Sequence, residues 1–132
     1  MSDTNDNLTG VWNGRYDYQH HLDPVGFMAT IIDSGASLSG GVSETCVDAD
    51  GIVVDLFAML SGRRSGSAVA FTKTYDESSG WNHSVEYDGR LSADGNEIEG
   101  EWRIPGKAHG RFLMVRPERK TTEVEQREEA KV

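Results

Sequence analysis

The chain has 132 residues, enough for one domain with one hydrophobic core. Its formal net charge of −9 argues against nucleic acid and anionic membranes as partners, because both bind basic surfaces. The single cysteine, Cys46, excludes an internal disulfide framework. There is no apolar run of the ~20 residues that a membrane span needs, and the first ten residues lack the pattern of a signal peptide. The expectation is a cytoplasmic protein.

Taken in chain order, the polar residues 1–9 are predicted to be disordered. Segments with strand patterns follow at residues 11–19, 27–33, 37–44, 52–61, 67–75, 84–91, 97–104 and 110–116. Between them, residues 45–51 are predicted to form a loop and residues 62–66 a turn. The tail 118–132 mixes both charge signs and is predicted to be disordered or a frayed helix.

The clearest pattern spans residues 84–104. Apolar and charged residues alternate strictly on both sides of Asp94-Gly95, which indicates two strands with one apolar face each. Asp94-Gly95 is typical of a two-residue type I′ turn, and such a turn sets a register in which Gly89 faces Gly100. Facing glycines in mid-strand let a hairpin bend, and bending is how a sheet closes into a barrel.

Eight strands with short connections and no helix between them predict an all-β fold. Sequential antiparallel pairing of these strands makes an eight-stranded up-and-down β-barrel over residues 10–117. The interior of a barrel of this size holds side chains or one small ligand.

Gly10-Val11-Trp12 opens the first predicted strand and resembles the GxW signature of the calycins, which include the lipocalins and avidins. The resemblance covers roughly residues 8–117. It implies that Trp12 closes one end of the barrel and packs against a basic residue of the last strand. Arg116 is the first choice for that residue and Arg111 the second.

Alternation places most of the aromatic side chains on the inner faces of the strands. They form either a packed core or the wall of a ligand site, and buried tyrosine hydroxyls would need partners from waters or a ligand. The candidate ligand contacts are Tyr16, Tyr18, Phe27, Phe71, Lys73, Tyr75, Tyr87, Trp102, Phe112 and Met114.

Lys73 is the most specific candidate among them, because it is a charged residue at an inward position. It has the same parity along its strand as Phe71 and Tyr75, which points it inward. A buried ammonium is costly unless it is paired, and its partner would be an anionic ligand group or a carboxylate such as Glu44. The alternative is a lysine near the barrel mouth whose ammonium extends to water.

The sequence predicts no catalytic residue, no cofactor and no metal site, because His20-His21, His83 and His109 do not form a converging set of three ligands. The leading prediction is non-enzymatic binding of a small amphipathic or acidic molecule in the lumen. The alternative is a packed barrel that acts as a protein-interaction or dimerisation module through residues 52–61, because both faces of that strand are apolar. The resemblance to the calycins also implies a third hypothesis, an enzyme such as a decarboxylase or cyclase. It would use Tyr and Glu as acid and base, and the sequence singles out no such pair.

Overall fold

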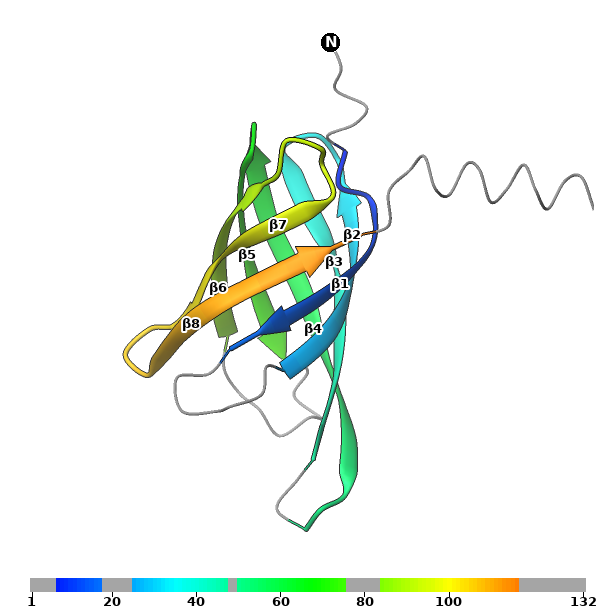
Figure 1. Cartoon of the computed structure of the whole chain (residues 1–132), viewed down its shortest axis with the longest axis vertical. Coiled ribbons are helices and arrows are strands. Elements are labelled where there is room, and N and C mark those ends of the chain that lie inside the picture. Colours follow the sequence, from blue (N-terminus) through cyan, green and yellow to red (C-terminus); the bar gives the residue numbers. More distant parts are fainter. Residues whose placement is uncertain (1–6, 18–24, 48–49, 76–83, 117–132) are drawn as a thin grey trace, which may run out of the picture.

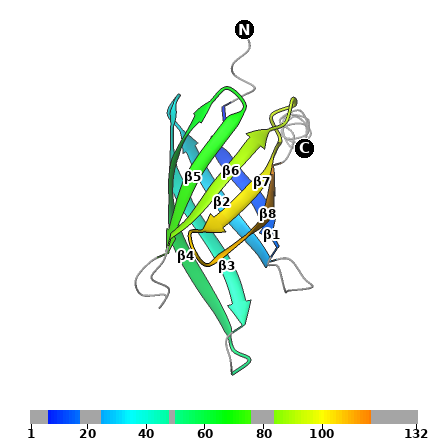
Figure 2. The same ribbon diagram turned by 90° about the vertical axis from the view of Figure 1, so that its left-hand side faces the viewer.

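The computed structural model describes residues 7–17, 25–47, 50–75 and 84–116. The strands are β1 (Gly10–Tyr16), β2 (Val25–Asp33), β3 (Ser37–Val47), β4 (Val53–Ser65), β5 (Ala68–Tyr75), β6 (Ser84–Leu91), β7 (Glu97–Ile104) and β8 (Ala108–Val115). Each strand pairs with the next, and β8 pairs with β1, so that the sheet closes on itself (Figures 1 and 2). The fold is the predicted all-β, eight-stranded antiparallel barrel. Across these ranges no helix is long and apolar enough to cross a membrane.

Inward and outward side chains alternate along each strand, because successive residues of a strand point to opposite faces. In β2, for example, Phe27, Ala29 and Ile31 are buried and the residues between them are exposed. The inward residues of all eight strands form one core inside the barrel. The same alternation in the sequence therefore fixes both the strands and the contents of the lumen.

The β6–β7 hairpin has the predicted register, in which Gly89 pairs with Gly100. The prediction of a type I′ turn at Asp94-Gly95 is wrong. Gly95 has a φ of 78°, but no non-glycine residue in the described ranges has a positive φ, so Asp94 does not meet the requirement of that turn. The strands close at Ser92 and Glu97, whose backbone hydrogen bond is 2.8 Å long, around a four-residue loop. The predicted two-residue loop and the observed four-residue loop give the same strand register, so the predicted pairing is correct although the predicted turn is not.

Two predicted connections are partly strand. β4 continues to Ser65, so the turn predicted at 62–66 is wrong, and the chain reverses at Gly66 and Ser67. The reason is that the alternation continues past Gly62: Arg64 forms an ion pair with the buried Asp33 at 2.9 Å. β3 likewise runs to Val47, into the predicted loop. Tyr18 and the tail 118–132 lie outside the described residues.

The structure describes the N-terminal segment from residue 7, inside the range 1–9 that is predicted to be disordered. Leu8 is fully buried, and its backbone N–H donates a hydrogen bond to Asp33 Oδ2 at 2.9 Å. Burial alone would raise the pKa of Asp33, but the hydrogen bonds from Leu8 and Arg64 outweigh it and hold this pKa below its usual value of 3.8. Residues 1–6 lie outside the described residues.

Trp12 and Arg116 close this end of the barrel, called here the Trp12 end. The Arg116 guanidinium carbon lies 4.6 Å from the centre of the Trp12 ring. Arg116 Nε also donates to the Gly95 carbonyl at 3.0 Å, and Trp12 Nε1 donates to the Leu8 carbonyl at 2.9 Å. Arg116, the first choice from the resemblance, is therefore the residue that covers Trp12.

A double-mutant cycle of Trp12→Leu and Arg116→Met should give a coupling energy of roughly 0.5–2 kcal/mol, the scale of a cation–π contact. The cost of leaving the Gly95 carbonyl unpaired occurs in both variants that lack Arg116 and cancels in the cycle. Urea unfolding of the four proteins measures the coupling. A value of zero would mean that the two side chains are neighbours without a stabilising contact.

Candidate functional site

Four polar side chains meet inside the barrel and are called here the Glu44 cluster: Tyr16, Glu44, Lys73 and Tyr75. Lys73 Nζ donates to Glu44 Oε1 at 2.9 Å, and the two groups form an ion pair. The Tyr75 hydroxyl donates to the same oxygen at 3.0 Å. The Tyr16 hydroxyl donates to Glu44 Oε2 at 2.8 Å. One carboxylate thus accepts three hydrogen bonds, one of them from a cation.

The cluster reaches across the lumen because its members come from strands that are not neighbours. Tyr16 lies on β1, Glu44 on β3, and Lys73 and Tyr75 on β5. Each side chain points inward because it occupies a buried position in the alternation of its strand. β1 and β5 lie on opposite sides of the closed barrel, so these contacts form only when the sheet curls into a barrel.

Lys73 is buried, with 2% of its surface exposed. Burial lowers the pKa of its ammonium below the usual 10.5, while Glu44 opposes this shift by favouring the charged form. Its Nζ lies between 4.7 and 5.8 Å from four ring centres, those of Tyr16, Phe27, Tyr75 and Tyr87. The interpretation of Lys73 as a residue that extends to water is therefore wrong, and the carboxylate of Glu44 is its partner.

Aromatic rings fill the lumen next to the cluster. Phe71 and Tyr87 stack with ring centres 4.7 Å apart, and Phe112 meets Tyr87 edge-on at 5.0 Å. Trp102 meets Tyr16 edge-on at 5.7 Å and donates its Nε1–H to the Asp17 carbonyl at 3.1 Å. In the described part of the chain, no buried side-chain nitrogen or oxygen lacks a hydrogen-bond partner. The polar groups among these rings are thus satisfied from within.

The structure brings together most of the candidate ligand contacts. Around the Glu44 cluster lie Tyr16, Phe27, Phe71, Lys73, Tyr75, Tyr87, Trp102 and Phe112. Met114 is also buried, but it pairs with Gly14 and Ile98, toward the Trp12 end. Glu44 was not among the predicted ligand contacts, although the sequence pattern places it on the inner face of its strand. Glu44 has the parity of Leu38 and Val42, so it is a charged residue on an apolar strand face, as Lys73 is.

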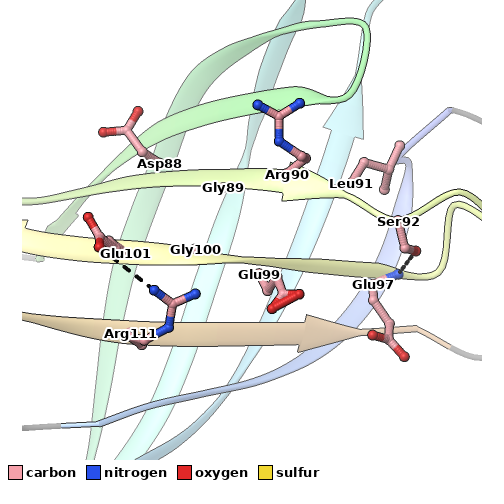
Figure 3. Close-up of a pocket in the computed structure, with 10 residues that line it drawn as sticks. All are labelled: Asp88, Gly89, Arg90, Leu91, Ser92, Glu97, Glu99, Gly100, Glu101 and Arg111. Carbon is pink, nitrogen blue, oxygen red and sulfur yellow. Dashed lines mark hydrogen bonds and ion pairs between the residues drawn. The ribbon is translucent and has the colours of Figure 1, made fainter.

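A groove of about 540 Å³ lies on the outer wall of the barrel, over β6, β7 and β8 (Figure 3). Gly89 and Gly100 form part of its floor, and charged side chains surround them, including the pair Arg111–Glu101 at 3.7 Å. The groove is lined by Asp88, Gly89, Arg90, Leu91, Ser92, Glu97, Glu99, Gly100, Glu101 and Arg111. It lies outside the barrel, whereas the sequence predicts a ligand site inside.

No protein-family model and no curated protein matches this chain. The barrel is similar to a solved structure described as a de novo design of a fluorescence-activating β-barrel. The TM-score is 0.58 and the sequence identity is 12%, and the match covers 89% of this chain and 100% of the designed one. At this identity the similarity shows the fold alone. The chain is an eight-stranded antiparallel barrel to which no family is assigned.

Proposed function

We propose that the barrel binds a small amphipathic molecule, without catalysis, at the end of its lumen that holds the Glu44 cluster. The observation that carries this proposal is the cluster itself, an ion pair and two phenols buried among aromatic rings. A buried ion pair is often no more stabilising than apolar side chains of the same volume. A few convergent polar groups in an otherwise apolar lumen are typical of a small-molecule site.

The two ends of the barrel differ in a way that supports entry beside Glu44. At the Trp12 end, Leu8 and Trp12 are fully buried, and Arg116 lies over the Trp12 ring. The Glu44 cluster lies toward the opposite end, where β1, β3, β5 and β7 finish (Figure 1). A ligand that enters there reaches the cluster without displacing the closure at Trp12.

The charge of the cluster argues for a neutral polar group on the ligand. Glu44 already compensates the ammonium of Lys73 at 2.9 Å, so the pair has no net charge. A ligand carboxylate would add a second negative charge beside Glu44, which is unfavourable at low dielectric. Of the two predicted ligand types, we therefore favour an amphipathic molecule with a neutral hydrogen-bonding group over an acid. The closure by Trp12 and Arg116 and the likeness to a designed fluorescence-activating barrel also support a ligand-binding lumen.

Native mass spectrometry of the protein purified from its source is the first test, because a retained small molecule would be detected directly. Titration with neutral and acidic fluorogenic aromatic probes is the second. Tyr16→Phe keeps the ring but removes the hydroxyl that contacts Glu44, and it should weaken the neutral probe about tenfold. The acidic probe should bind less well than the neutral one to the wild-type protein.

The control is Phe57→Ser, because Phe57 is 58% exposed on the outer wall and offers a competing apolar surface. This variant should bind both probes as the wild type does. The proposal is wrong if no molecule is retained and no probe saturates, or if Phe57→Ser abolishes binding while Tyr16→Phe leaves it unchanged.

A further inference from the structure

The outer wall of the barrel is charged on one side and nearly uncharged on the other. Of the exposed side chains that the structure describes on β2–β5, only Asp55 and Arg63 are charged. The outer wall of β6–β8, by contrast, exposes Asp88, Arg90, Glu97, Glu99, Glu101, Arg103 and Arg111. In a chain with 27% charged residues this asymmetry marks β2–β5 as a distinct surface, called here the neutral wall.

The neutral wall exposes large apolar side chains on β2 and β4. Met59 is 68% exposed and Phe57 58%, and across β3 from them Met28 and Ile32 are about half exposed. The outward residues of β3 between these two rows are small: Ser39, Gly41 and Ser43. The result is a shallow apolar surface without a charge at its centre. Surfaces of this kind usually mark contacts with another macromolecule.

We propose that the neutral wall binds a second copy of this chain, with the two β4 strands antiparallel across a two-fold axis at Met59. The order of the outward residues along β4 supports this arrangement. Asp55 and Arg63 lie four residues before and four residues after Met59, and all three point outward. A two-fold axis at Met59 therefore brings Asp55 toward Arg63 of the partner subunit, and the reverse contact forms by symmetry.

The charges of the neutral wall favour a second copy of this chain over a different partner. The only two exposed charges described on β2–β5 have opposite signs and equal offsets from Met59, so the surface is complementary to itself. Asp55 accepts one hydrogen bond from Thr45 through Oδ1, which leaves Oδ2 for a contact. In a chain of net charge −9, the neutral wall is the surface on which two copies can approach with the fewest charged groups between them.

The contact is between sheet faces rather than strand edges. From Ala58 to Ser65, β4 is paired with β3 on one side and with β5 on the other, so its backbone groups at Met59 are already used. Packed sheets lie about 10 Å apart with their side chains interleaved. Phe57 then packs against Ser61 of the partner subunit, a large residue against a small one.

Sedimentation velocity of the full chain between about 1 µM and about 1 mM is the test. We expect a concentration-dependent dimer. Met59→Lys puts two ammonium groups together at the axis and should raise the dissociation constant at least about 100-fold. Val115→Lys on β8 is the matched control, since Val115 is also exposed and apolar but lies outside the neutral wall, and it should leave the dimer unchanged.

Charge exchange at Asp55 and Arg63 tests the two-fold arrangement itself. Asp55→Lys alone and Arg63→Glu alone each oppose like charges and should weaken the dimer about tenfold, while the double variant should restore wild-type affinity. Near-ultraviolet circular dichroism verifies that each variant is folded. A monomer at every concentration, a dimer that Met59→Lys does not weaken, or a double variant no tighter than the single ones would each overturn the proposal.

Discussion

Replacing Lys73 by methionine should lower the free energy of unfolding by about 3–5 kcal/mol, the cost of leaving one member of a buried ion pair without its partner. Methionine fills a similar volume, so the loss reports the missing ammonium and not a cavity. Glu44 would keep its hydrogen bonds from Tyr16 and Tyr75 but would lose the cation at 2.9 Å. Chemical unfolding followed by fluorescence measures the loss.

The double variant Glu44→Gln with Lys73→Met separates the charge from the packing. Glutamine carries no charge, and its one carbonyl oxygen can accept from one tyrosine hydroxyl while its NH2 group donates to the other. This variant should therefore recover most of the stability that Lys73→Met loses. Thr74→Met on the same strand is the control, because Thr74 is exposed and methionine there should be nearly neutral. A loss below about 1 kcal/mol for Lys73→Met would show that water reaches Glu44.

Gly100→Val should cost about 4 kcal/mol or more, which is exceptional for a single substitution. A Cβ at Gly100 would overlap the backbone carbonyl of Asp88 and lie 2.5 Å from the Cα of Gly89. Backbone atoms cannot move aside as a flexible side chain can, so the paired strands would have to separate. Thermal unfolding should show a large fall in Tm.

Gly26→Val is the matched control for this substitution. Gly26 is also a strand glycine, but a Cβ there would lie 3.9 Å from its nearest neighbour, the Gly14 carbonyl, which is ordinary contact. This variant should unfold within about 0.5 kcal/mol of the wild type. If Gly100→Val were equally stable, the close approach of β6 and β7 at Gly89 and Gly100 would not be a feature of the protein.

The β6–β7 hairpin shows which structural features can be predicted from local sequence patterns. Its register was predictable because the apolar alternation agrees on both strands and opposite charges face each other at Arg90–Glu99 and Glu86–Arg103. Only Asp88 and Glu101 pair like charges. The turn was not, because its geometry depends on hydrogen bonds made by the side chains of the loop. Ser92 Oγ accepts the Glu97 N–H at 3.0 Å, and Asp94 Oδ1 accepts the Asn96 N–H at 3.0 Å. These bonds favour a four-residue loop, which a preference for Asp-Gly as a dipeptide does not describe.

The sequence predicts which residues line the candidate site but not which of them contact one another. Alternation alone places Lys73 and the aromatic residues inside the barrel. Which charge meets Lys73 depends on the stagger of the strands around the barrel, because Glu44 lies two strands away on β3. Period-two patterns carry no information on that stagger. The sequence therefore left the partner of Lys73 open between Glu44 and a ligand.

Closure of the sheet between β1 and β8 also has a consequence for how the chain folds. Every other pairing joins strands that follow one another in sequence, whereas Asn13 pairs with Val115 near the opposite end of the described chain. Closing so long a loop has an entropic cost that local hairpins do not pay. Hairpins such as β6–β7 can therefore form early, and the contact of Trp12 with Arg116 forms only when the ring closes. The kinetic barrier to folding should lie at this last junction.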